Sequence, residues 1–242
     1  MHLRRGIHLR RVCNPIVLIR WCAMALEIRT VIDESERHRV FRFRYRVYVE
    51  EMGLNIAEAD HKRRWVHDHV DEHAIILAAF DGETIHGTVC LNFAAVGLGR
   101  HEETLRLREL KPYFPNHVST TTRLIVSKQY RNGTLGTRLA KAGFRIYLAH
   151  GMLFDIICCH PRQRAYFENL GYRRLLPDLE LEGYGSSHVM VLALADKDHL
   201  CAIRSPFSSF LAELPSNRDS VEFLEHLLAV KQDRDAACSP LT

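Results

Sequence analysis

The chain has 242 residues, of which 47% are hydrophobic and 26% are charged, a composition that excludes a disordered protein. The length is sufficient for one sizeable hydrophobic core with a small appendage. The formal net charge of +4 is mild, which disfavours a nucleic-acid-binding protein but is compatible with an acidic protein partner.

The seven cysteines are odd in number and show no C-x-x-C spacing. This pattern predicts reduced thiols in a cytoplasmic protein, because disulfide frameworks and structural zinc sites need paired or regularly spaced cysteines. Beyond its N-terminal segment, the sequence has no apolar run of the length that a membrane-spanning helix needs.

The first 23 residues carry several arginines ahead of a short apolar patch, which Arg20 interrupts. The patch has no small-residue cleavage site and is too short to span a bilayer, so a signal peptide is not predicted. We expect residues 1–23 to be a basic arm or a mis-assigned start, and we favour a start at Met24. Membrane contact is expected only through this arm or through the product.

A strand at residues 25–32 is followed by a long helix, for which Asp33 is the N-cap and which should run to about Met52. Arg44 projects from the middle of the apolar face of this helix. Burying an unpaired charge costs several kcal/mol, so Arg44 must find an acidic partner or reach a cleft. A solvated face is expected for the neighbouring arginines Arg39, Arg42 and Arg46.

Residues 53–70 show no periodicity and predict a long surface loop. Alternate positions at its end carry His67, His69, Asp71 and His73, which an extended chain would place on one face, where they could bind a metal. Such clusters are more often ordinary loop polarity, and no later stretch offers a clear second set of ligands. No metal site is therefore predicted.

The remaining elements alternate along the chain. Further strands are expected at residues 74–80, 84–93, 120–127, 152–158, 172–176 and 188–194. Helical segments are expected at residues 105–110, 135–149, from Pro161 to near Gly171, and 221–230. This order predicts an α/β fold in which helices cover both faces of one sheet.

The strand at 120–127 leads through a basic, glycine-containing turn into the helix that starts near residue 135. Such a turn directs backbone N–H groups and the positive end of a helix dipole to one place, which suits a pyrophosphate or phosphopantetheine. An ordinary strand-to-helix turn is the alternative. The residues expected to hold the ligand are Ile125, Val126, Ser127, Arg131, Asn132, Gly133, Thr134, Leu135 and Gly136.

The element order and this turn resemble the GNAT N-acyltransferase superfamily over roughly residues 26–194. The phosphate turn of that family reads Q/R-x-x-G-x-G/A. Residues 129–131 (QYR) match its start, whereas Asn132 and Thr134 stand at its two glycine positions. The resemblance implies a mixed, mostly antiparallel sheet in a domain spanning residues 24–195. The weaker pattern from Asp196 onward predicts a C-terminal helical extension and tail at 196–242.

A second stretch, residues 165–172 (AYFENLGY), resembles the family's A-x-Y-E-K-L-G-F ending. Phe167 stands where the family commonly has a tyrosine that protonates the leaving thiolate. The adjacent Tyr166 is the candidate for that role in this chain.

The N-terminal half resembles the acyl-carrier-protein-dependent branch, which comprises the LuxI-type acyl-homoserine lactone synthases and the long-chain N-acyl amino acid synthases. The similar stretches are residues 43–53 (FRYRVYVEEMG), 68–71 (DHVD) and 122–126 (TRLIV). The resemblance implies an ionic cluster beside the acyl site, formed by Arg44, Asp68, Asp71 and Arg123.

Two positions depart from the lactone synthases. Cys90 takes the place of another arginine of the cluster, and Thr120 that of a glutamate proposed as a base. These departures favour an N-acyl amino acid synthase over a lactone synthase.

The resemblance implies transfer of a fatty acyl group from an acyl carrier protein to the amine of an amino acid or similar small acceptor. The donor would be the acyl-phosphopantetheine of the carrier or acyl-CoA, without a tightly bound cofactor. A backbone N–H near Val126 would polarise the thioester carbonyl. Candidate bases are His160, at a strand end, and Glu109.

Three alternatives remain open at this point. One is a CoA-dependent GNAT acetyltransferase, and another is a non-catalytic module that binds acyl carrier protein. The third is a metal protein that uses the cluster of histidines and aspartates at residues 67–73. The departures at Asn132, Thr134, Cys90 and Phe167 are the features that support the module.

Overall fold

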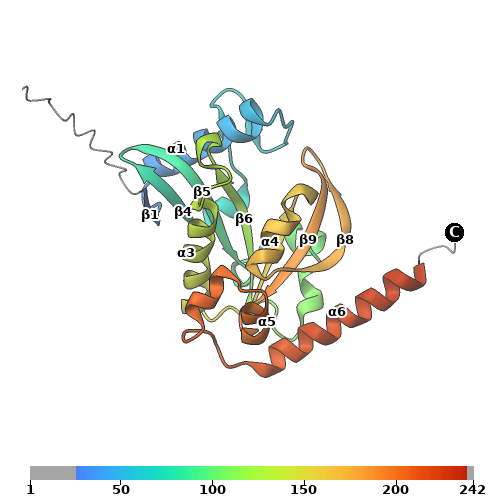
Figure 1. Ribbon diagram of the computed structural model, residues 1–242. Coiled ribbons are helices and arrows are strands. Elements are labelled where there is room, and N and C mark those ends of the chain that lie inside the picture. Colours follow the sequence, from blue (N-terminus) through green and yellow to red (C-terminus); the bar gives the residue numbers. More distant parts are fainter. Residues whose placement is uncertain (1–25, 239–242) are drawn as a thin grey trace, which may run out of the picture.

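The computed structural model describes residues 26–238, and its framework is a seven-stranded sheet with strand order β1-β4-β5-β6-β7-β9-β8 (Figure 1). Neighbouring strands are antiparallel except β6 and β7, which are parallel. The N-terminal arm and Met24 lie outside the described residues. The strands of this sheet are β1 (Glu27–Thr30), β4 (Ile75–Asp81), β5 (Thr84–Phe93), β6 (Val118–Val126), β7 (Phe154–Cys159), β8 (Arg173–Leu181) and β9 (Gly185–Ala193).

Six α-helices and several shorter helical turns connect and cover these strands in the described part of the chain. The α-helices are α1 (Glu34–Tyr45), α2 (Arg100–Thr104), α3 (Leu135–Ala149), α4 (Arg164–Leu170), α5 (Lys197–Ala202) and α6 (Arg218–Cys238). The shorter turns are η1 (Arg46–Glu51), η2 (His69–Glu72), η3 (Ala94–Val96), η4 (Leu107–Leu110), η5 (Lys128–Tyr130), η6 (Pro161–Gln163) and η7 (Pro206–Phe210).

The mixed α/β fold with a mostly antiparallel sheet and a C-terminal helix is confirmed. Asp33 caps α1 as expected, because its side chain accepts the backbone N–H of Glu36 at 2.7 Å. The helix then continues to Glu51 as a π-helical turn. In the loop at 53–70, the sequence analysis missed a short hairpin whose strands have two residues each, β2 (Ala59–Asp60) and β3 (Trp65–Val66).

Strand β8 is longer than expected, because it continues past Pro177 to Leu181. Proline interrupts a ladder by removing a donor, but it is tolerated on an edge strand. β8 is such an edge strand, and its register to β9 shifts between Leu176 and Leu179. In a central strand, a proline would predict the end of the strand. In the edge strand β8, Pro177 marks only an irregularity in the pairing with β9.

Two hydrophobic layers enclose the sheet. On one face, α3, α4 and η7 pack against β5 and β9, with the Phe144 and Phe207 rings stacked 4.2 Å apart. On the opposite face, α1 covers β4 and β5, whereas η4 and α6 cover β7 and β9. In Figure 1, α3 and α4 lie in front of the sheet and α6 runs below β8 and β9. The C-terminal extension therefore contributes to both layers.

Strands β6 and β7 stay paired over only three residue pairs, from Val118 with Phe154 to Thr120 with Ile156. Beyond this point β6 pairs with β5 alone, and β7 pairs with β9 alone. The two parallel strands therefore part after Thr120, and the residues from Thr121 to Val126 are only partly buried. This parting is the feature of the fold that positions the candidate site.

The tip of the β8–β9 hairpin contacts the loop that follows η1. A Cβ atom on Gly183 would lie 2.4 Å from the backbone oxygen of Asn55 and 2.9 Å from the Cα of Ile56. Next to it, the ring of Tyr184 packs edge-on against Tyr48, with centroids 6.0 Å apart. The last hairpin of the sheet thus reaches across to the N-terminal half.

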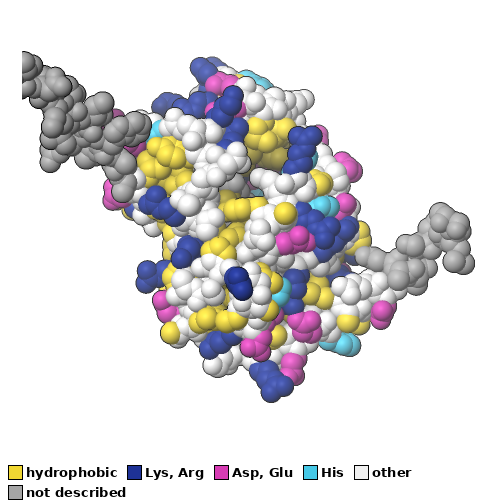
Figure 2. Space-filling view, viewed as in Figure 1, with side chains coloured by type: hydrophobic (Ala, Val, Ile, Leu, Met, Phe, Trp, Pro, Cys, Tyr) yellow, Lys and Arg dark blue, Asp and Glu magenta, His cyan; other side chains and the backbone are white. Residues whose placement is uncertain are grey.

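On the face that carries α3 and α4, basic and acidic side chains are interspersed rather than gathered by sign (Figure 2). This distribution agrees with the mild net charge of +4. Among the helices of residues 26–238, none combines the length and the hydropathy required to cross a bilayer.

We expect Gly183→Ala to destabilise the protein more than Gly185→Ala. Both glycines have a left-handed φ, +77° and +73°, so both variants carry the cost of about 1 kcal/mol for that conformation. Only Gly183 also meets backbone atoms, which should add about 1–3 kcal/mol of overpacking. Urea unfolding of the two variants measures the difference, and equal losses would show that the hairpin tip does not pack against the loop.

Candidate active site

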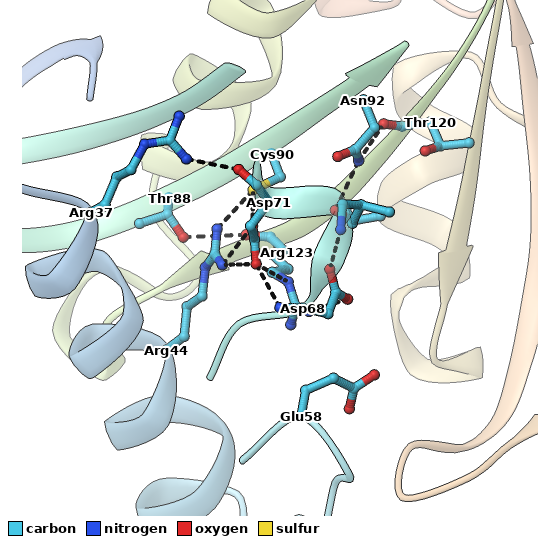
Figure 3. A network of polar contacts seen from close by, with 12 residues as sticks. Arg37, Arg44, Glu58, Asp68, Asp71, Thr88, Cys90, Asn92, Thr120 and Arg123 are labelled. Carbon is cyan, nitrogen blue, oxygen red and sulfur yellow. Dashed lines mark hydrogen bonds and ion pairs between the residues drawn. The ribbon is translucent and has the colours of Figure 1, made fainter. Parts of the chain in front are cut away.

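Arg44 is completely buried between α1 and the sheet. Its Nη1 atom donates to both carboxylate oxygens of Asp71, at 2.9 Å each. Figure 3 shows this contact at the centre of a polar network that joins α1, η2, β5 and β6. The acidic partner that the helix position of Arg44 requires is therefore Asp71.

The two acids of this network are oriented by their own backbone. Asp68 caps η2, because its side chain accepts the N–H of Val70 at 3.0 Å. Asp71 in turn accepts the N–H of Asp68 at 3.0 Å, which completes a reciprocal capping box. Each carboxylate is held by a backbone N–H group as well as by an arginine, which restricts its orientation within the cluster.

Arg123 reaches the same acids from β6. Its Nη2 donates to Asp68 at 2.6 Å, and its Nε lies 3.8 Å from Asp71. The pairing of β5 with β6 shifts register opposite this residue, and Arg123 has a left-handed φ of +55°. A β-bulge redirects a side chain in this way, so the bulge aims Arg123 at the cluster.

Cys90 completes the cluster on β5. Its Sγ lies 2.7 Å from Nη2 of Arg44 and 3.2 Å from a carboxylate oxygen of Asp71. Burial raises the pKa of the Cys90 thiol to about 12, so the thiol stays protonated and donates to Asp71. Burial also opposes ionisation of Asp71, but Arg44 and Arg123 outweigh it and lower the pKa of its carboxyl to about 2. Asp71 is therefore a permanent counter-charge at neutral pH.

The turn between β6 and α3 keeps the shape of an anion cradle. Asn132 adopts a left-handed φ of +65°, which asparagine tolerates better than most residues other than glycine. Among the described residues, no side chain caps the N-terminus of α3, and its first turn holds no acidic residue. Its first N–H groups and dipole are thus available to a phosphate. Arg131 lies beside the turn, where it binds Glu51 at 2.6 Å and the carbonyl of Val126 at 3.3 Å.

Tyr166 points toward this cradle from α4. A Cβ on Gly136, in the first turn of α3, would lie 3.2 Å from the Tyr166 hydroxyl. This hydroxyl is buried beside the side chain of Thr137, in the same turn of α3. Phe167 points into the hydrophobic core instead. The structure therefore brings Tyr166, and not Phe167, together with the turn.

The two candidate bases lie apart from each other. His160 is exposed at the end of β7, beside the parting of the strands, and its ring accepts the N–H of Arg162 at 3.1 Å. Glu109 belongs to η4, which packs against Val118 at the start of β6, and it pairs with Lys231 of α6. Val118 and Val126 are separated by roughly 25 Å of strand, so the structure does not bring Glu109 to the turn.

The histidines near Asp71 do not assemble with it. His67 stacks on Phe41 with ring centroids 5.0 Å apart, whereas His69 faces His101 at 5.8 Å. Across residues 26–238, no group of three or more His, Cys, Asp or Glu side chains is arranged to hold a metal ion. The alternate spacing of these residues in the sequence therefore does not bring their side chains together around one point in the described structure.

Comparison with known proteins identifies the family. The model of the family described as N-acyl amino acid synthase FeeM matches residues 39–194, which is more than half of the chain. The chain belongs to the FeeM family of N-acyl amino acid synthases. It is therefore an N-acyltransferase, an enzyme that transfers an acyl group to an amine, and the alternative of a non-catalytic module is set aside.

Individual relatives of this FeeM-family chain are distant. A protein of Bacillus subtilis (strain 168) that carries the name of an acetyltransferase is 26% identical over 158 residues, 65% of this chain and 90% of that protein. The structure of FeeM from uncultured soil microbes aligns with a TM-score of 0.56 and 15% identity, covering 76% of this chain and 97% of that chain. BjaI, described as a CoA-dependent acyl-homoserine lactone synthase with SAM and isopentyl-CoA, aligns with a TM-score of 0.56 and 16% identity, covering 75% and 90%. The structural alignments show the shared fold.

The structure also reveals a second buried network that the sequence analysis missed. Asp155 of β7 is 1% exposed and accepts hydrogen bonds from Ser119 (2.9 Å), Thr121 (2.7 Å) and the Tyr172 hydroxyl (2.5 Å). In the described part of this FeeM-family chain, no basic side chain pairs with it. Burial raises the pKa of Asp155 to about 6, although its hydroxyl donors act in the opposite direction. The sequence signal that could have revealed this network was a single acidic residue within the otherwise apolar stretch 152–158.

We expect Arg44→Ala to lower the free energy of unfolding by about 3–5 kcal/mol, because it leaves Asp71 buried without its main partner. The matched control is Arg42→Ala on the exposed side of the same helix, for which a change within about 0.5 kcal/mol is expected. Urea unfolding followed by circular dichroism measures both. Equal effects of the two substitutions would contradict the role of Arg44 in the cluster.

Asp155 should make stability depend on pH. Its pKa is about 6 in the folded protein and about 3.9 in an unfolded chain, so the folded state binds this proton more tightly. The free energy of unfolding should therefore fall by about 3 kcal/mol as the pH rises from about 4 to about 6, and stay lower above that. Asp155→Asn should abolish this pH-dependent loss of stability, whereas Asp81→Asn at an exposed turn should preserve it. Urea unfolding between about pH 4 and about pH 6 measures both variants.

Proposed function

We propose that this N-acyltransferase moves a fatty acyl group from the phosphopantetheine thioester of an acyl carrier protein to the amine of an amino acid or similar small acceptor. The observation that carries the proposal is the cluster of Arg44, Asp71, Arg123 and Asp68. It ties α1 and the loop after it to the bulge of β6, beside the parting of β6 from β7. The carrier-dependent branch is expected to have this cluster at the acyl site.

The parting of β6 and β7 provides a place for the thioester. In the proposed arrangement, the pantetheine arm lies between the two strands, with its phosphate at the N-terminus of α3 and near Arg131. A backbone N–H near Val126 would polarise the thioester carbonyl. The bound acceptor amine then attacks this carbonyl at short range, which removes much of the entropic barrier.

The leaving thiolate needs a proton, and Tyr166 is the proposed donor. Its hydroxyl is buried and faces the first turn of α3, where the side chain of Thr137 lies beside it. Burial raises the pKa of Tyr166, so the phenol is protonated at neutral pH and can donate a hydrogen bond to the sulfur as negative charge develops there.

A CoA thioester is the second candidate donor, and one observation favours it. Asn132 preserves the left-handed turn at a family glycine position, and the N-terminus of α3 is uncapped, so the cradle also suits a pyrophosphate. The structural relative BjaI is itself described as CoA-dependent. CoA and the carrier share the phosphopantetheine arm, so a direct comparison of the two donors is needed.

The test presents one myristoyl chain on acyl carrier protein and on CoA, together with acetyl-CoA, and a mixture of the standard amino acids as acceptors. We expect N-myristoyl products by mass spectrometry, formed fastest from the carrier thioester. Equal or faster turnover of acetyl-CoA would contradict the proposal and favour a CoA-dependent acetyltransferase. Tyr166→Phe should lower the rate by about 100-fold. The control is Tyr113→Phe, which should leave the rate unchanged because Tyr113 contacts Phe154 on the opposite face of the sheet.

A further inference from the structure

The turn between β6 and α3 does not by itself choose between the two candidate donors. Acyl carrier protein and CoA present the same phosphopantetheine arm, and the N-terminus of α3 suits the phosphate of either. The donors differ beyond that phosphate. The carrier continues from it as a single phosphodiester, whereas CoA adds a second phosphate and a 3′-phosphate. A residue that brings negative charge to the turn can therefore distinguish the two donors.

Such a residue is in contact with the turn. Arg131, next to Asn132, donates from Nη2 to the carboxylate of Glu51 at 2.6 Å and from Nε to the carbonyl of Val126 at 3.3 Å. The side chains of Arg131 and Glu51 are 37% and 25% exposed, so the pair lies where a ligand from solvent can meet it. Any phosphate that approaches Arg131 therefore also approaches Glu51.

Glu51 is brought to the turn by the helix that carries the ionic cluster. It is the last residue of η1, which continues α1 without a break. Val47 and Tyr48 of η1 are buried, and the ion pair of Arg44 with Asp71 anchors α1 itself. The carboxylate of Glu51 thus projects from the end of a packed helical segment.

The neighbouring acid of η1 has a different partner. Glu50 pairs with Arg64, in the turn of the β2–β3 hairpin. The two acids are adjacent in the chain and carry the same charge, but of the two it is Glu51 that contacts the turn before α3. Glu50 is therefore a matched control for any effect of Glu51.

The carboxylate of Glu51 should act unequally on the two donors. A single phosphate at the turn gains from the dipole of α3 and from Arg131, and loses part of this gain to Glu51. The second phosphorus of CoA is joined to the first through one oxygen, so it lies within the Debye length of about 8 Å and is repelled in addition. Lys128 of η5 is exposed, and its charge attracts both donors.

We propose that Glu51 sets the donor preference of this enzyme, because its carboxylate favours the single phosphodiester of acyl carrier protein over the pyrophosphate of CoA. This inference rests on the proposed function and narrows it to one donor. The chemical step is the same for both donors, since the acyl group passes from sulfur to the amine nitrogen and a thiol is released. Glu51 acts on donor binding, so its effect belongs in KM rather than in kcat.

Calorimetric titration separates the phosphates from the rest of the donor. The ligands are 4′-phosphopantetheine, which ends in one phosphate, and CoA, which carries the same arm. Glu51→Gln should lower the Kd of CoA about 10-fold and that of 4′-phosphopantetheine less than about 3-fold. Glu50→Gln should change neither value. Equal shifts for the two ligands, no shift, or binding of neither ligand at millimolar concentration would overturn the inference.

Turnover provides the second measurement. With one myristoyl chain on both donors and the mixture of standard amino acids, Glu51→Gln should raise kcat/KM for CoA about 10-fold relative to that for the carrier, through KM. Glu51→Lys should enlarge this change. The change should shrink at about 1 M salt, where the Debye length is about 3 Å. A change that persists there, or that appears equally in Glu50→Gln, would contradict an electrostatic role of Glu51.

Stability and product formation separate the possible failures. Glu51→Gln should unfold within about 0.5 kcal/mol of the unmodified protein, because it removes an ion pair at the surface. N-acyl product from the carrier with an unchanged donor preference in Glu51→Gln would overturn this inference alone. Absence of N-acyl product from the unmodified protein would overturn the proposed function, and with it the carrier as the favoured donor.

Discussion

The ion pair between Arg44 and Asp71 is the constraint to which the N-terminal half of the protein conforms. A fully buried guanidinium is tolerable only when its charge is paired, so the chain must deliver an acid to it from a distant segment. The capped turn at η2 delivers Asp71, and the bulge of β6 supplies Arg123 as a second counter-charge. Three segments that are far apart in the sequence are thereby held in one arrangement beside the opening of the sheet.

Part of this arrangement can be predicted from the sequence. Periodicity gives the order of the elements, and the helical position of Arg44 demands an acidic partner, although Asp71 was assigned only by resemblance. The length of β8 could not be predicted, since whether Pro177 ends a strand depends on whether that strand is an edge. The left-handed backbone of Asn132 and the isolation of Asp155 could not be predicted either, because both depend on the tertiary fold.

Strand β6 carries a polar network on each face, and one atom joins them. The carbonyl oxygen of Thr120 accepts the Asn92 amide at 3.0 Å and the Tyr147 hydroxyl at 3.0 Å. Asn92 also bonds Thr122 on the face of the ionic cluster, whereas Tyr147 bonds Thr121 in the network of Asp155. The backbone carbonyl of Thr120 thus connects the polar networks on the two faces of β6.

The short pairing of β6 with β7 gives the sheet a seam. Three residue pairs join two antiparallel blocks, one made of β1, β4, β5 and β6 and the other of β7, β9 and β8. Ser119 and Thr121 on one block both donate hydrogen bonds to Asp155 on the other, so these side chains link the two blocks where the ladder is short. The three residue pairs can therefore serve as a hinge between the two blocks. A small rotation about this hinge would widen or narrow the gap between β6 and β7 at the far end of the strands.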